Sequence, residues 1–353
     1  MSNIKRFIKE FGSARIIIAL FLLSLFFTAP LVGVSVTASI ADVITRFGMN
    51  SVMVLSLVPM VLSGCGLNFG TSVGIIGGIF GALIALELNL SGAAGFLTSV
   101  VIAIILGFII GYFYSKILNK VKGDEMIIAT YIGYAFIYLM NMFYLVLPFK
   151  NPELVQGFKG EGLRVTISLK EHWQFIISKI AAINLGNKIE AAGGGGGSFI
   201  PVGMLIFFAI CAYLIWMFFK TKTGTAMIAA GSNPVYAKSA GINVDKMRTL
   251  SVMISAALSA VGILIYQQSY GFVELYMAPL AFNFPTVAAL LLGGASVKKA
   301  SITNVVIGTL LFQGMLTMTP SVINAAINAD ISDIVRIIVT NGMILYALTR
   351  KGK

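Results

Sequence analysis

The stretch 92–115, GAAGFLTSVVIAIILGFIIGYFYS, runs for 24 residues without a charged side chain. The hydrocarbon core of a bilayer is about 30 Å thick and requires roughly 20 apolar residues in a spanning helix, so this stretch is long enough to cross a membrane. Further apolar runs lie at 16–36, 49–65, 70–88, 126–148, 199–219, 249–268, 280–297, 301–319 and 333–349. The sequence therefore predicts an all-α polytopic membrane protein with about ten transmembrane helices.

The composition of the whole chain agrees with a lipid environment. Of the 353 residues, 58% are hydrophobic and only 11% are charged, whereas a soluble domain has about 45–50% apolar and about 25% charged residues. A soluble globule would still need a polar surface, and this chain has too few charged residues to form one. We therefore expect a single transmembrane domain over residues 1–353. Pro279 and Pro285 interrupt the eighth run and predict a short or re-entrant helix there.

The basic residues indicate orientation rather than nucleic-acid binding. The net charge is +12, but the basic residues lie at the ends of the apolar runs and form no stripe with interleaved aromatic residues. With the N-terminus inside, 17 of the 25 Lys and Arg residues fall on the cytoplasmic side. This predicts cytoplasmic N- and C-termini, an extracytoplasmic loop at 149–198 and a cytoplasmic loop at 220–248. Asp42 and Arg46 are expected outside, and Arg336 is expected to pair with Asp333.

Few residues are suited to catalysis or to metal binding. The two cysteines, Cys65 and Cys211, each lie in an apolar run, and His172 is the single histidine. This inventory excludes a disulfide framework, a His-based triad and a site with several His ligands. An intramembrane enzyme would need a nucleophile and base at membrane depth, and no such pair is evident.

Glycines recur every fourth residue in the third run, at Gly70, Gly74 and Gly78. Small residues at this spacing let helix backbones approach closely in a membrane, so we expect these residues to pack against another helix.

The loop 149–198 contains two distinctive segments. Residues 171–183, which include Trp173, are expected to form an amphipathic helix at the membrane interface. The run of five glycines at 193–197 lacks the Lys-Ser/Thr of a phosphate-binding loop and is interpreted as a flexible connector.

The loop 220–248 contains signals for two short helices. Asn233 followed by Pro234 suits an N-cap and a first helical position, and Gly241 suits a left-handed helix end. A first piece, 225–230, is expected to end at Gly231. A helix this short is marginal alone, so its caps indicate either docking onto a partner or an ordinary surface helix.

This loop resembles the cytoplasmic signature of bacterial ABC-importer permeases, in the branch for simple sugars such as ribose, nucleosides and branched-chain amino acids. Positions that match the pattern of this family are Gly231, Asn233, Ala237, Ala240, Gly241 and Ile242. Three other segments are similar to motifs of the family: LNFG at 67–70, the start of the run at 125–131, and AALLLGGAS at 288–296, which contains Gly293 and Gly294. The two glycines are expected to pack helices closely.

The resemblance implies a complex in the bacterial cytoplasmic membrane. Two permease subunits, identical or related, would form the channel. Two ATPase subunits would bind ATP and dock from the cytoplasm, and an extracytoplasmic binding protein would deliver solute. This chain would hold no cofactor, in agreement with its lack of a G-x-x-x-x-G-K-[ST] motif. Residues expected to couple it to the ATPase are Gly224, Gly231, Asn233, Pro234, Ala237 and Gly241.

The resemblance favours a simple sugar or a nucleoside as the transported solute. A branched-chain amino acid is the nearest alternative, and a self-sufficient secondary carrier is a further one. Candidate residues along the translocation path are Gln267, Gln268, Asn283, Phe284 and Gln313. Buried polar residues of this kind also join helices to one another, and the sequence leaves both roles open.

Overall fold

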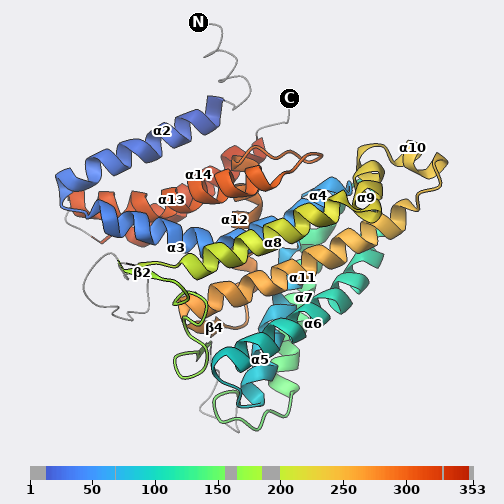
Figure 1. Cartoon of the computed structure of the whole chain (residues 1–353), viewed down its shortest axis with the longest axis horizontal. Helices are drawn as coiled ribbons and strands as arrows, with labels where there is room; N and C mark the ends of the chain where they lie inside the picture. Colours follow the sequence, from blue (N-terminus) through green and yellow to red (C-terminus); the bar gives the residue numbers. More distant parts are fainter. Residues whose placement is uncertain (1–12, 68, 156–164, 185–198, 328–329, 350–353) are drawn as a thin grey trace, which may run out of the picture.

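A computed structural model describes residues 13–67, 69–155, 165–184, 199–327 and 330–349. They form a bundle of helices with two small pairs of strands (Figure 1). The helices are α2 (Ser13–Thr28), η1 (Ala29–Val32), α3 (Val36–Leu55), α4 (Leu57–Leu62), α5 (Thr71–Glu87), α6 (Gly92–Lys120), α7 (Glu125–Val146), α8 (Val202–Lys220), α9 (Lys222–Ser232), α10 (Pro234–Ser239), α11 (Val244–Tyr270), α12 (Ala278–Leu292), α13 (Ile302–Ile327) and α14 (Ser332–Thr349). The strands are β1 (Thr166–Ser168), β2 (Ile183–Asn184), β3 (Phe199–Ile200) and β4 (Phe272–Glu274).

Seven helical segments in the described ranges are long and apolar enough to cross a membrane: Arg15–Val32, Val36–Leu62, Gly92–Lys120, Glu125–Val146, Val202–Lys220, Val244–Tyr270 and Ile302–Ile327. Two shorter apolar helices, α5 with 17 residues and α12 with 15, lie among them. At about 1.5 Å per residue, both are shorter than the hydrocarbon core. The all-α polytopic class is confirmed, and α14 occupies the tenth predicted run.

The short helix α12 agrees with the prediction made from its two prolines. Pro279 lies in the first turn, where a missing N–H costs nothing, and Pro285 lies inside the helix. The predicted run to residue 297 is too long, because the helix ends at Leu292 and Gly294 adopts a left-handed φ of 91°.

The second predicted span begins too late. The helix starts at Val36, after Ser35, whose hydroxyl accepts a hydrogen bond from the Ala38 N–H. Asp42 and Arg46, which were expected in an outer loop, therefore lie one turn apart within α3. Side chains four residues apart share a helix face, so the two opposite charges support the helix instead of ending it.

The helix α11 lies in the interior of the bundle, packed against α5, α6 and α3 (Figure 1). About two thirds of its most apolar window is buried, compared with 17–28% in α2, α6, α7 and α8. The latter four helices therefore present their apolar faces outward, as lipid-facing helices do.

Glycines let α5 and α11 meet backbone to backbone. A Cβ atom added at Gly74 would lie 2.5 Å from the Ala256 carbonyl oxygen, and one added at Gly78 would lie 2.3 Å from the Ala260 carbonyl oxygen. Gly70, the first of the expected packing glycines, instead precedes α5 as its N-cap residue. A Cβ at Gly293 would lie 1.8 Å from the Asn304 carbonyl oxygen, so α12 and α13 meet in the same way.

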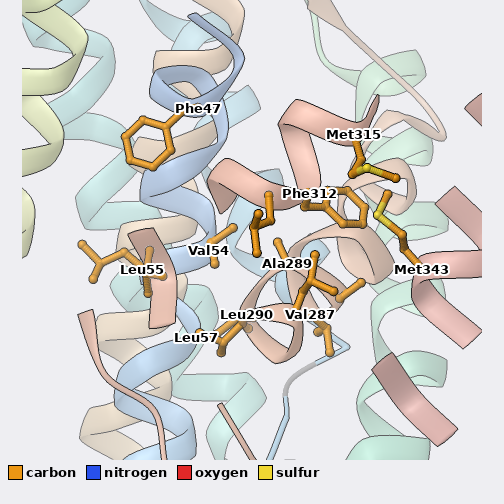
Figure 2. Close-up of a cluster of buried hydrophobic side chains, with 14 of the residues drawn as sticks. Phe47, Val54, Leu55, Leu57, Val287, Ala289, Leu290, Phe312, Met315 and Met343 are labelled. Carbon is orange, nitrogen blue, oxygen red and sulfur yellow. The ribbon is translucent and has the colours of Figure 1, made fainter. Parts of the chain in front are cut away.

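A second contact region joins α3, α4, α12, α13 and α14. Figure 2 shows Leu57 near Leu290 and Phe312 near Met343, whereas Phe47 lies on the other side of α3, where its ring meets that of Phe208 on α8. All of these side chains are buried, and they fix the short α12 within the bundle.

The segment 171–183 is not the expected amphipathic helix. It forms a series of turns, and Trp173 is buried at 1% exposure within a hydrophobic cluster that includes Ile177 and Met204. Just before it, β1 pairs antiparallel with β4, with Thr166 opposite Glu274. The loop therefore folds onto the end of α11, because its aromatic side chain and its backbone find partners there. The glycine run 193–197 lies outside the described residues.

We predict that Gly78→Val destabilises the protein by about 1–3 kcal/mol, because the added side chain meets the backbone of α11. Thermal unfolding of the detergent-purified chain measures the effect. The control is Gly342→Ala on α14, where an added Cβ meets nothing within 4 Å. Similar unfolding temperatures for the two variants would contradict the packing argument.

Candidate functional site: the α9–α10 segment and its contacts with the bundle

Polar caps define the two short helices between α8 and α11. The Thr221 hydroxyl accepts a hydrogen bond from the Gly224 N–H at 3.1 Å and begins α9. The Asn233 side-chain oxygen accepts one from the Tyr236 N–H at 3.0 Å and begins α10, with Pro234 in its first turn. Gly241 follows α10 with a φ of 80°, a conformation that glycine adopts without steric cost. The two side-chain caps each satisfy a backbone donor that so short a helix would otherwise leave unpaired, and the backbone N–H groups of Gly241 and Ile242 donate to the last carbonyl oxygens of α10.

The helix α9 rests on the turn that follows α4. A Cβ atom at Gly231 would lie 2.1 Å from the Leu62 carbonyl oxygen and 2.7 Å from the Gly64 nitrogen. Only a glycine permits this contact between two backbones. At the other end of α9, a Cβ at Gly224 would lie 2.2 Å from the Phe218 carbonyl oxygen, so the chain turns tightly out of α8.

The outer face of α10 is exposed. Val235 is 81% exposed and Tyr236 is 69% exposed, whereas Ala237 is fully buried against the segment. Both α9 and α10 project at one end of α11, and β4 lies at the other end (Figure 1). An open groove beside α10 is lined by Lys122, Pro234, Val235, Lys238, Ser239 and Val244.

A buried ion pair lies beneath this segment. The guanidinium of Arg248, at the start of α11, donates to Glu125 Oε1 at 2.6 Å, to Asn119 Oδ1 at 3.1 Å and to the Gly64 carbonyl oxygen at 3.2 Å. The two charged side chains are only 8% and 14% exposed. Arg248 therefore joins α11 to α6, to α7 and to the turn on which α9 rests.

A serine pair reinforces the same turn. The Ser63 and Ser251 hydroxyl oxygens lie 2.6 Å apart, and both side chains are buried. Contacts through Gly231, the 62–65 turn, and the two side chains Arg248 and Ser251 thus connect α9 to α11.

The pairing of Arg248 with Glu125 was not expected from the sequence. Arg248 was one of the basic residues that indicated orientation, and Glu125 was the residue at which a span began. In the sequence, such a pair would be indicated only by one acidic and one basic residue at the ends of two different spans. They are 123 residues apart in the chain, so only the tertiary structure shows that they meet.

The expected path residues do not gather in one place. Gln268 has no exposed surface, and its side chain bonds to the Ile177 N–H, to the Ser178 hydroxyl and to the Ile265 carbonyl oxygen. The Asn283 side-chain oxygen accepts a hydrogen bond from the Ser72 N–H at 2.7 Å and so joins α12 to α5. Both side chains join elements of the bundle.

Gln267 has different surroundings from its neighbour, because adjacent residues on a helix point about 100° apart. It is 2% exposed, yet its side-chain oxygen has no hydrogen-bond partner in the described structure. It lines a crevice with Tyr266, Phe272, Glu274 and Phe282. An unpaired buried acceptor lowers the stability of the fold by about 1–3 kcal/mol, so the unpaired oxygen of Gln267 needs an explanation.

The remaining two path residues lie apart from this crevice. Phe284 packs against Phe69 with ring centroids 5.2 Å apart, and Gln313 is buried on α13. Neither lines the crevice beside Gln267.

The last span carries the expected ion pair, with Arg336 and Asp333 3.9 Å apart on the exposed surface. An exposed pair of this kind contributes little to stability.

The bundle, with seven segments able to span a membrane and a capped projection at one end, defines a multi-pass membrane protein. The family described as "Branched-chain amino acid transport system / permease component" matches residues 39–344. The chain belongs to this family of permeases. Its membership of this family and its apolar helices both indicate a multi-pass protein of the bacterial inner membrane.

Three curated proteins illustrate what this chain is similar to. The nucleoside ABC transporter permease protein NupB of Lactococcus lactis is 24% identical over 67% of this chain and 59% of its own length. A tyrosine transport system permease protein of Clostridioides difficile is 26% identical over 48% of this chain and 56% of its own length. The xylose/arabinose import permease protein XylH of Sulfolobus acidocaldarius is 31% identical over 35% of each chain. The matched regions thus span less than two thirds of each relative.

We predict that Glu125→Ala lowers the free energy of unfolding by about 3–5 kcal/mol, because it leaves the Arg248 guanidinium buried without its counter-charge. The control is Asp245→Ala, which removes an exposed pair with Lys122 and should cost less than about 1 kcal/mol. Thermal unfolding of the purified variants measures both changes. Equal losses would show that the buried pair has no special role.

Proposed function

We propose that this chain is the membrane-spanning permease subunit of an ATP-binding-cassette importer. In this proposal α9 and α10 couple it to a separate ATPase subunit. Two permease subunits, identical or related, would form the channel, and an extracytoplasmic binding protein would deliver solute. The chain itself would be non-catalytic and hold no cofactor, with ATP bound by the partner. The support for this assembly is the family membership together with the nucleoside and sugar permeases among the relatives.

The observation that carries the coupling role is the construction of the α9–α10 segment. Its caps hold a rigid shape, its inner face rests on backbone through Gly231, and its outer face exposes Val235 and Tyr236. Exposed apolar and aromatic side chains on a rigid projection suit insertion into a groove of a partner protein. Asn233, Pro234, Ala237, Gly224 and Gly241 would act by maintaining this shape.

The contacts also suggest how a pull on the segment would reach the membrane helices. Closure of the ATPase pair would displace α9, and the 62–65 turn would transmit the displacement to Arg248 and Ser251 on α11. Since α11 is packed tightly against α5 and α6, it would move with them as a unit. Alternating access needs only that ATP binding favour one packing of the bundle over another.

For the transported solute we propose a simple sugar or a nucleoside, in line with the xylose/arabinose and nucleoside relatives. An amino acid is the second candidate, favoured by the tyrosine permease among the relatives and by the description of the family.

The proposal is tested by purifying the tagged chain from its native membrane and measuring which proteins accompany it and whether the preparation hydrolyses ATP. A co-purifying ATPase subunit is expected. A chain that purifies alone and still moves solute into liposomes would contradict the importer and favour a secondary carrier.

We predict that the double variant Val235→Asp, Tyr236→Ala reduces co-purification of the ATPase at least tenfold, because both side chains lie on the exposed face of α10. The unfolding temperature of the permease should remain unchanged, since neither side chain is buried. Val297→Asp, at a residue that is 48% exposed between α12 and α13, is the control and should retain the ATPase. Retention by the double variant would contradict the docking role.

We also predict that Gly241→Val uncouples ATP hydrolysis from uptake while the chain still inserts and folds. The substitution places a β-branched residue at a φ of 80°, which costs about 1–3 kcal/mol locally and distorts the end of α10. The ratio of solute taken up to ATP hydrolysed, measured in proteoliposomes, should fall. An unchanged ratio would count against coupling through this segment.

A further inference from the structure

The crevice beside Gln267 lies at the end of α11 opposite the α9–α10 segment. Its lining includes Tyr266 and Gln267 from α11, Phe272 and Glu274 from β4, and Phe282 from α12. The Tyr266 and Phe282 rings meet edge to face, with centroids 4.9 Å apart. The site thus combines aromatic faces with two groups that accept hydrogen bonds.

The two acceptors are of different kinds. The side-chain oxygen of Gln267 is buried and lacks a partner in the described structure. In a native protein an unpaired buried acceptor calls for an explanation, such as a bound molecule that donates to it. Glu274 is partly buried at the rim, where its strand pairs with β1. Burial raises the pKa of its carboxyl group above the ordinary value.

Neighbouring charges make the surroundings polar for a site within a membrane bundle. Tyr266 lies close enough to Glu274, Arg46 and Arg336 to interact with all three electrostatically. Arg46 was expected in an outer loop but lies within α3. Its Nε is also buried without a hydrogen-bond partner in the described structure. Polar and ionisable groups are costly at membrane depth and typically mark the paths of solutes.

The crevice is closed in this conformation, since it is too narrow to admit a water molecule. Ala278, Pro279 and Phe282, near the start of α12, line the crevice together with residues of α11, so a shift of α12 away from α11 would open it. The chain between β4 and α12 passes through Tyr276, whose φ of 56° is unfavourable for a bulky residue. A movement of α12 would have this strained link as its pivot.

We propose that this crevice is a solute-binding site within the permease, in which Gln267 and Glu274 accept hydrogen bonds from the hydroxyl groups of an uncharged, ring-bearing solute and the Tyr266 and Phe282 rings contact the face of that ring. This assignment rests on the proposed importer function. It adds the chemical class of solute: a sugar or nucleoside supplies several hydroxyl donors for the two acceptors and a ring face for the aromatic side chains.

The experiment uses the complete importer reconstituted in liposomes, with ATP-driven uptake of radiolabelled xylose, arabinose, uridine and tyrosine as the readout. ATP hydrolysis by the same vesicles is recorded as an independent measure of assembly. The variant Gln267→Met replaces the unpaired oxygen by an apolar side chain of similar volume. Its neighbour Gln268→Met serves as the matched control, because the Gln268 side chain is bonded to Ile177 and Ser178.

We expect Gln267→Met to raise the KM for the transported sugar or nucleoside at least tenfold, with ATP hydrolysis retained and an unfolding temperature that is unchanged or higher. Gln268→Met should instead lower the unfolding temperature and leave the KM of the folded complex within about twofold of wild type. Glu274→Gln, which keeps an acceptor oxygen, should raise the KM less than Glu274→Leu.

An unchanged KM in Gln267→Met, with ATP hydrolysis intact, overturns the site. Uptake of tyrosine alone by the wild-type complex overturns the class of solute. Failure of the wild-type chain to assemble with any ATPase overturns the importer function itself, which is a separate result because it shows in the ATP hydrolysis of the unmutated protein.

Discussion

The close backbone contact of α11 with α5 and α6 is the constraint on which the rest of the structure depends. In a bilayer the lipid tails are as apolar as the side chains, so helices associate through close packing instead of exclusion from water. Glycines and alanines supply that packing here, at Gly74 and Gly78 against Ala256 and Ala260. The helices α2, α7 and α8, which are mostly exposed, lie at the outside of the bundle.

Both candidate sites lie at the ends of that rigid unit. At one end Arg248 connects α11 to the turn beneath α9, and at the other end Gln267 and Gln268 have different surroundings. A tightly packed helix transmits a displacement with little deformation. The proposed ATPase contact and the proposed solute site would therefore communicate through α11 itself.

Much of the fold could be predicted from the sequence, because lipid imposes a strict requirement on length and polarity. Each of the ten apolar runs overlaps a helix of the described structure, the second run overlapping both α3 and α4, and the Asn233 and Gly241 signals predicted a capped segment between α8 and α11. The errors occurred where local pattern and tertiary contact disagree. Asp42 and Arg46 suggested a loop but lie within α3, and the segment around Trp173 suggested a surface helix but is folded against α11.

The sequence by itself determined the solvent of this protein, the positions of its apolar helices and the place of the capped segment between α8 and α11, since these depend on composition and on short-range spacing. Only the tertiary structure decided which polar residues are paired. Gln267 and Gln268 are identical and adjacent in sequence, yet one side chain is saturated with hydrogen bonds and the other has an unpaired oxygen. The pairing of Arg248 with Glu125 was likewise settled by the fold. Hydrogen bonds and ion pairs between distant segments depend on which helix faces are brought together, and no local pattern encodes that.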